Sequence, residues 1–98
     1  MYFLYVSKPV DKEYDFDTIL NYCSLSLEEI GWEIDEIYAD GWTNIPNGIE
    51  DLISDAKANS KKLKGITLSS LEEISQENIR QLQGICPVYC VLTPWLEP

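Results

Sequence analysis

The chain has 98 residues and a net charge of −10, from 17 acidic and seven basic side chains. It contains no histidine and a single arginine, Arg80, which excludes a Ser-His-Asp triad, a histidine general base and phosphate recognition by several arginines. Three cysteines without histidine cannot complete a four-ligand zinc site, so we expect neither a metal nor a cofactor.

The first 40 residues predict a strand, a helix and a second strand. Residues 2–6 form an aromatic and β-branched run that is typical of a buried strand, and this run ends at Ser7. Residues 32–39 alternate apolar and acidic side chains, which predicts a second strand that ends at Asp40. Between them lies one apolar helical face that stops before Gly31 and comprises Phe16, Ile19, Leu20, Cys23, Leu27 and Ile30.

The remaining residues predict two more helices and two more strands. Residues 47–50, Asn-Gly-Ile-Glu, resemble a capping box at the start of the second helix. Residues 65–68 predict a third strand and residues 87–92 a fourth, and a third helix between them opens at Ser70 or at Ser75. The apolar face of the second helix comprises Ile49, Leu52, Ile53 and Ala56.

Strand and helix patterns therefore alternate as β-α-β-α-β-α-β over one domain, residues 1–98. This order predicts an α/β fold of three layers: a four-stranded parallel sheet with flanking helices, of the flavodoxin-like type. Ligands of such sheets bind at the carboxyl ends of the strands. The sequence has no glycine-rich phosphate-binding motif there.

Composition also bears on location. Apolar residues make up 45% of the chain, which supports a packed core, and no apolar run reaches the length of a membrane span. No basic region precedes the first apolar run, so we expect no signal peptide. Three unevenly spaced cysteines are typical of a reduced, cytoplasmic protein, and we expect no contact with a membrane.

The residues resemble, in order along the chain, the catalytic domain of the serine recombinases, the resolvases and invertases. Residues 5–7, Tyr-Val-Ser, stand where the family has Arg-Val-Ser at the end of its first strand. Residues 70–76, Ser-Leu-Glu-Glu-Ile-Ser-Gln, are similar to the family's Ser-Leu-Asp-Arg-Leu-Ser-Arg. Three further stretches look like the family's second strand with its terminal aspartate, the helix that usually follows Arg-Pro-Gly, and the fourth strand: residues 31–40, 47–58 and 88–93. The resemblance implies a resolvase-like fold.

The resemblance also implies which chemistry is missing. In the family a serine attacks a DNA phosphodiester while several arginines hold the scissile phosphate, and Ser7 occupies the nucleophile position here. The arginine positions hold Tyr5, Pro46, Glu73 and Gln76. Each lost contact of this kind costs about 10²–10³ in rate, so the four substitutions predict no strand cleavage. The chain also stops near the fourth strand, without the family's long dimerising helix and basic DNA-binding domain, so we expect a trimmed, catalytically inactive resolvase-like domain.

Serine and cysteine positions each have a reactive and a structural interpretation. Ser7 is either a retained nucleophile or a serine that ends a strand, with its hydroxyl bonded to backbone; no histidine or arginine adjoins it. Cys86 and Cys90 follow a C-x₃-C spacing. In a strand they would lie about 13 Å apart, too far for a disulfide, which favours buried core cysteines.

Candidate interaction residues are acidic or aromatic. The first 55 residues carry 13 acidic and two basic side chains, so we expect no direct binding of nucleic acid. Trp42 and Trp95 fall near the carboxyl edge of the predicted sheet, as interface anchors or as packing over the edge of the core, whereas Trp32 is expected to face the core. An acidic cluster is either a partner-binding surface or a solvated face, and it comprises Glu28, Glu29, Glu33, Asp35, Glu36 and Asp40.

Three functions follow from these interpretations. The first is a catalytically inactive resolvase-like domain, compatible with an origin in a mobile element, that acts as a protein-interaction or regulatory module and binds a protein partner. The second is a residual serine recombinase that uses Ser7. The third is an acidic DNA mimic that inhibits a DNA-binding protein. The substituted arginine positions favour the first, and a homodimer is compatible with it.

Overall fold

The computed structural model describes residues 1–7, 15–40, 48–69 and 74–91. Strands and helices alternate along the chain in the predicted order. The strands pair in the order β2-β1-β3-β4, and all three pairings are parallel. The elements are β1 (Tyr2–Ser7), α1 (Phe16–Ile30), β2 (Glu36–Asp40), α2 (Ile49–Ala58), β3 (Gly65–Leu68), α3 (Gln76–Gln83) and β4 (Val88–Cys90).

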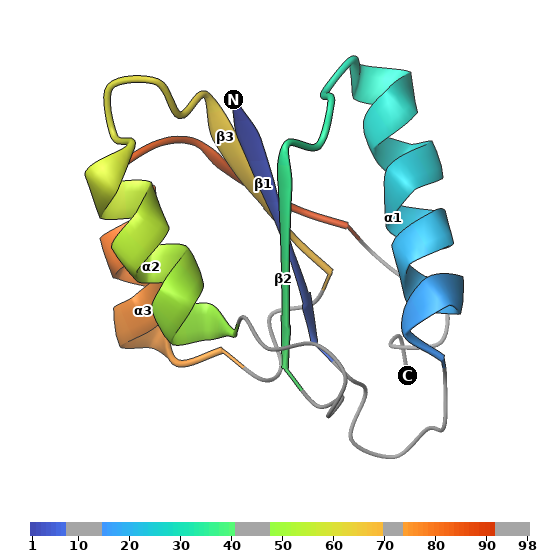
Figure 1. Cartoon of the computed structure of the whole chain (residues 1–98), viewed down its shortest axis with the longest axis horizontal. Helices are drawn as coiled ribbons and strands as arrows, with labels where there is room; N and C mark the ends of the chain where they lie inside the picture. Colours follow the sequence, from blue (N-terminus) through green and yellow to red (C-terminus); the bar gives the residue numbers. More distant parts are fainter. Residues whose placement is uncertain (8–14, 41–47, 70–73, 92–98) are drawn as a thin grey trace.

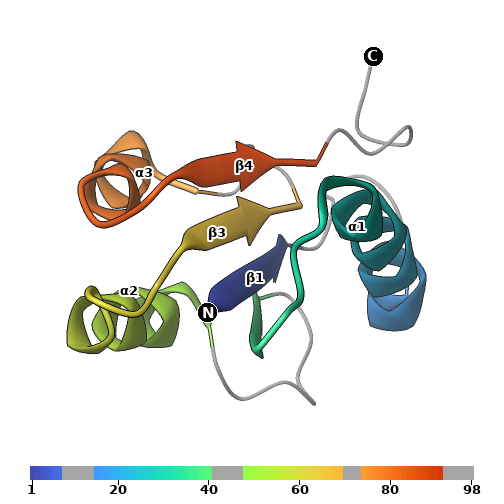
Figure 2. The same ribbon diagram turned by 90° about the horizontal axis from the view of Figure 1, so that it is seen from above.

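The helices form the outer two of three layers. Helix α1 covers one face of the sheet, and α2 and α3 cover the other (Figures 1 and 2). The crossover from β1 to β2 runs in the opposite direction from the later two, so right-handed crossovers place α1 opposite α2 and α3. This arrangement confirms the predicted three-layer α/β fold with a four-stranded parallel sheet of the flavodoxin-like type.

Each face of the sheet has its own apolar cluster, and alternate residues of β1 supply both. Phe3 and Tyr5 belong to the cluster under α2 and α3, whereas Leu4 and Val6 belong to the cluster under α1. All four are at most 2% exposed. A strand buried on both faces reads as a continuous apolar run, which is why residues 2–6 show no polar alternation.

The helix ends follow local signals. Gly31 ends α1 in the left-handed conformation, with φ of +78°, as its sequence position predicts. Ser75 caps α3, and its hydroxyl accepts a hydrogen bond from the Asn78 N–H at 3.2 Å, so the second of the two predicted starts is correct. The N-cap of α2 is Gly48, whose N–H donates to the Asp51 carboxylate at 3.3 Å, rather than the expected pair in residues 47–50. Asn47 itself lies outside the described residues.

Two strands are shorter than the sequence predicts. Strand β2 begins at Glu36, not at residue 32: the Trp32 N–H bonds to the Leu27 carbonyl at the end of α1, at 3.1 Å, and the Trp32 ring packs against Tyr2 of β1. Its ring stacks on Tyr2 at 4.7 Å between centroids and lies so close to Gly65 that a Cβ there would meet it at 2.6 Å. Strand β4 spans three residues within the predicted 87–92.

No helix in the described part of the chain is long and apolar enough to cross a membrane.

Candidate functional site

The carboxyl ends of the strands form the edge at which parallel sheets of this kind bind ligands. The direction of the crossovers reverses between β1 and β3, so the topological switch point lies there. Strand β1 ends at Ser7, and Ser69 directly follows β3. The candidate nucleophile therefore lies at the position where the topology would place a ligand.

Ser7 is enclosed by its neighbours at this point. It is 3% exposed, and its N–H donates to the Ser69 hydroxyl at 2.9 Å. The two hydroxyl oxygens lie 3.5 Å apart, and Ser69 is fully buried. In the part of the chain that the structure describes, no basic side chain bonds to Ser7. In this geometry Ser7 and Ser69 link the end of β1 to the end of β3 by hydrogen bonds.

A second cluster at the same edge joins β1, β2 and α2. The Tyr5 hydroxyl donates to an Asp40 carboxylate oxygen at 2.6 Å, and that oxygen also accepts the Ile49 N–H at 3.0 Å. Gly48 lies so close to the same carboxylate that a Cβ on Gly48 would collide with Asp40 Oδ1. We call these four residues, Tyr5, Asp40, Gly48 and Ile49, the carboxylate clasp.

In the carboxylate clasp, the start of α2 binds an anionic group of the chain itself, the Asp40 carboxylate. The first N–H groups of a helix and its macrodipole attract anions, and Asp40 already places a carboxylate at that end of α2. In the resemblance to serine recombinases Tyr5 stands at an arginine position. Here the Tyr5 hydroxyl donates a hydrogen bond to the Asp40 carboxylate, and it carries no positive charge that could bind a phosphate.

Of the other three positions that the resemblance pairs with arginines, only Gln76 lies in the described residues, and it does not join this cluster. Gln76 is the exposed first residue of α3, and no hydrogen bond joins it to Ser7 or Asp40 in the part of the chain that the structure describes. Pro46 and Glu73 lie outside the described residues, as do Trp42 and Trp95. The structure therefore brings together Tyr5 and Asp40, with Ser7 at the end of the same strand as Tyr5.

The six residues of the predicted acidic cluster divide between the two edges of the sheet. Asp40 ends β2, whereas Glu36 begins it, and a strand of this length rises about 13 Å. We call the group at the amino edge the acidic end of α1; it comprises Glu28, Glu29, Glu33, Asp35 and Glu36, all exposed. The Asp35 carboxylate accepts the Tyr2 N–H at 2.7 Å. The other four carboxylates have no hydrogen bond or ion pair among the described residues.

The acidic end of α1 opposes the charge rule that the other helices obey. Helices α2 and α3 carry acidic residues in the first turn and a basic residue, Lys57 or Arg80, in the last. The last turn of α1 has no basic residue and instead carries Glu28 and Glu29. Negative charge at the negative end of a helix macrodipole is unfavourable by about 0.3–1 kcal/mol per residue. Stability of the isolated chain does not account for this placement.

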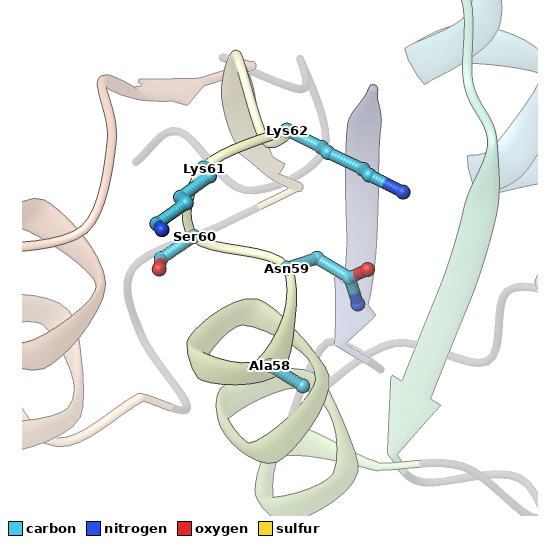
Figure 3. A pocket seen from close by; sticks show the side chains of 5 residues that line it. All are labelled: Ala58, Asn59, Ser60, Lys61 and Lys62. Atoms are coloured by element: carbon cyan, nitrogen blue, oxygen red, sulfur yellow. The ribbon is translucent and has the colours of Figure 1, made fainter.

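A basic turn between α2 and β3 is a charged surface that was not among the candidate sites expected from the sequence. Four of the seven basic residues lie in it, all exposed, and no acidic residue occurs from 56 to 71, a signal visible in the sequence. We define the basic turn as Lys57, Lys61, Lys62 and Lys64. A hollow of about 250 Å³ lies on this turn, lined by Ala58, Asn59, Ser60, Lys61 and Lys62 (Figure 3).

The cysteines are free thiols. Burial, and to a smaller extent the electrostatic interaction with Cys90, raises the pKa of Cys23 to about 12. Burial also raises the pKa of Cys86 and of Cys90. Protonated thiols are poor nucleophiles and poor metal ligands. Among the described residues no three cysteine, aspartate or glutamate side chains are grouped so that they could hold a metal ion.

Comparison with models of known protein families, with curated proteins and with solved structures finds no match to this chain.

Proposed function

We propose that the chain is a catalytically inactive, resolvase-like module that acts by binding another protein. The observation that carries this proposal is the acidic end of α1, where Glu28 and Glu29 oppose the helix macrodipole without an ion pair among the described residues. Charge that costs stability without an intramolecular partner is expected where an intermolecular partner supplies the compensation.

The carboxyl edge of the sheet supports the inactive part of the proposal. Ser7 is buried against Ser69, and Asp40 fills the start of α2 with the chain's own carboxylate. A scissile phosphate would have to displace a carboxylate held by two hydrogen bonds and would meet no cation among these residues. A cytoplasmic location and an origin in a mobile element are parts of the same proposal.

The partner is expected to present basic side chains. A basic surface would complement four unpaired carboxylates, and a DNA-binding protein is one class that offers such a surface. For a DNA-binding protein, the module would compete with DNA for that surface. For any other basic partner, DNA would not compete.

The test asks which proteins of a cell lysate bind to the immobilised chain, with and without the negative charges at the acidic end of α1. The wild type, a variant with Glu28→Gln, Glu29→Gln and Glu33→Gln, and a control with Asp17→Asn, Glu50→Gln and Glu77→Gln are immobilised and exposed to a lysate of the producing cells. The variant and the control change the net charge equally. We expect a basic protein that the wild type and the control retain and the variant loses, with binding that weakens steeply with salt. Retention of nothing above background by the wild type would contradict the proposal.

The inactive part has its own test. The chain is incubated with supercoiled DNA, and protein–DNA adducts are sought by denaturing electrophoresis. We expect none. An adduct that forms with the wild type and is lost with Ser7→Ala would establish a residual recombinase instead.

A further inference from the structure

The basic turn carries more positive charge than the adjoining helix end explains. Lys57 lies in the last turn of α2, where a cation favours the helix macrodipole. Lys62 and Lys64 lie beyond the helix, and the dipole effect falls off within its last turn. None of the four lysines has an ion pair with a described residue. Four exposed like charges in eight residues repel one another, so the turn favours an anionic partner.

The shape of the turn favours a broad partner over a small anion. Figure 3 shows Lys61 and Lys62 pointing away from each other on opposite sides of the turn, so their ammonium groups do not converge. The Asn59 amide already donates to the Asp55 carbonyl at 2.8 Å. The side chains therefore offer a spread of positive charge instead of a socket for one phosphate or sulfate.

The chain itself carries a matching acidic surface on the same edge. All three helices end at the amino edge of the sheet, so the acidic end of α1 and the basic turn both lie there (Figure 1). They flank the start of β1: the Asp35 carboxylate accepts the Tyr2 N–H at 2.7 Å, and the Lys64 N–H donates to the Met1 carbonyl at 2.7 Å. With neighbouring strands about 4.8 Å apart, the starts of β2 and β3 are separated by about 10 Å.

We propose that the basic turn docks against the acidic end of α1 of a second copy of this chain. One edge holds two patches of opposite sign, which lie on opposite sides of the sheet (Figure 1). A two-fold axis in the plane of this edge, between the patches, sets each basic turn opposite the partner copy's acidic end, and both contacts form at once. Such an isologous interface is self-complementary in charge.

The distribution of the remaining charge suits this mode of association. The acidic end of α1 carries five acidic residues and the basic turn four basic ones, so the two patches together are almost balanced, and the other residues carry nearly all of the net charge of −10. Docking through these two patches therefore brings together charges that are almost balanced. Ile30, 42% exposed at the end of α1, adds apolar surface to the contact.

This inference rests on the proposed function only in that it assigns the acidic end of α1 to protein contact. Its test is a charge-swap experiment followed by sedimentation and native mass spectrometry, from about 1 µM to about 1 mM protein. One variant carries Lys61→Glu, Lys62→Glu and Lys64→Glu, and the other carries Glu28→Lys, Glu29→Lys and Glu33→Lys. Circular dichroism and thermal melting verify that each variant folds.

The wild type forms dimers that dissociate as NaCl rises from about 0.05 M to about 0.5 M, with at least a tenfold increase in the dissociation constant. Each variant alone is monomeric, because it brings like charges together, and an equimolar mixture of the two forms a heterodimer of the summed mass. A control with Asp17→Lys, Glu50→Lys and Glu77→Lys, which changes net charge as the second variant does, remains dimeric.

A wild type that stays monomeric throughout, together with a mixture that forms no heterodimer, would overturn the inference. If such a monomer still retained a basic protein through the acidic end, the proposed function would stand and only the second copy would be excluded. If the wild type dimerised but the variants did so as well, the interface would lie elsewhere and the inference would also fail.

Discussion

Tyr5 and Tyr38 are register partners on the neighbouring strands β1 and β2, and each phenol donates a 2.6 Å hydrogen bond to a carboxylate. Tyr5 bonds to Asp40 at the end of β2, and Tyr38 bonds to Asp55 of α2. Both rings are at most 2% exposed. The pair thus fills the layer between the sheet and α2 with apolar rings and places both hydroxyls on carboxylates, which satisfies buried polar atoms at their tips.

Removal of either hydroxyl should destabilise the chain. We expect Tyr5→Phe and Tyr38→Phe each to lower the free energy of unfolding by about 1–2 kcal/mol, because each loses a hydrogen bond to a charged acceptor. Urea unfolding measures the change. The matched control is Tyr89→Phe, which removes a hydroxyl from a side chain that is 38% exposed and should change stability by less than about 0.5 kcal/mol. Equal effects at all three positions would contradict the two carboxylate bonds.

Gly48 should be intolerant of a side chain as long as Asp40 is present. In Gly48→Ala the new methyl group collides with the Asp40 carboxylate, which the Tyr5 hydroxyl and the Ile49 N–H hold in place. We expect a loss of about 1–3 kcal/mol in the free energy of unfolding. In an Asp40→Ala background the same substitution should cost much less, since the colliding group is gone. Additive effects in a double-mutant cycle would show that the two residues do not touch.

Substitutions at the acidic end of α1 should raise the stability of the chain and weaken its binding to a protein partner. Glu28→Lys and Glu29→Lys each place a cation at the negative end of the macrodipole, so we expect each to raise the free energy of unfolding by about 0.3–1 kcal/mol at low salt. The same variants should weaken protein binding. Denaturant unfolding and the binding assay, run on the same samples, test both effects. A variant that loses stability and keeps its binding would argue for a structural role of these carboxylates.

Alkaline pH should destabilise the fold through buried acids that must stay protonated. Burial raises the pKa of Cys23 to about 12, and burial together with the hydrogen bond to Asp55 raises the pKa of Tyr38 well above its usual value. Because both folded-state pKa values exceed those of the unfolded chain, the stabilisation is fully present below about pH 8.5 and is lost as pH rises. Unfolding in urea at a series of pH values measures the decline.

Thiol reagents give an independent check at neutral pH. Cys23 is fully buried and protonated, so it should react only as fast as the chain unfolds, whereas the half-buried Cys90 should react sooner. Mass spectrometry of digests after short labelling times identifies the modified residue. Labelling of Cys23 at the rate of Cys90 in the native protein would contradict the burial.

Gly65 reports on the packing of Trp32. A methyl group at Gly65 would meet the indole ring at 2.6 Å, so Gly65→Ala should displace the ring from its stack on Tyr2. We expect a loss of about 1–3 kcal/mol in stability and a changed tryptophan emission spectrum. The matched control is Gly84→Ala, where the nearest atom lies at 3.5 Å. An unchanged spectrum in Gly65→Ala would contradict this packing.

The amino-acid sequence by itself determined the order of elements and the fold class. Hydrophobic spacing is a local property, so the run at residues 2–6, the helical face before Gly31 and the short third strand could be located from neighbours in the chain. The burial of Cys23 and Cys86 was also predictable, since apolar residues flank them, whereas Cys90, which was expected in the core as well, is only half-buried. The absence of histidine excludes the chemistry that depends on an imidazole, whatever fold the chain adopts.

Only the tertiary structure decided which residues share a site. The Tyr5–Asp40 bond spans 35 positions in sequence, and it exists because β1 and β2 pair in register. The early start expected for β2 was wrong: the Trp32 N–H bonds to Leu27 at the end of α1 and the Trp32 ring lies against Gly65, contacts that alternation of neighbouring residues does not reveal. The length of β2 separated Asp40 from the other acidic residues, and the parallel direction of the strands placed the basic turn on the same edge as the acidic end of α1. Long-range charge and hydrogen-bond partners depend on strand order, and strand order emerges only when the chain folds.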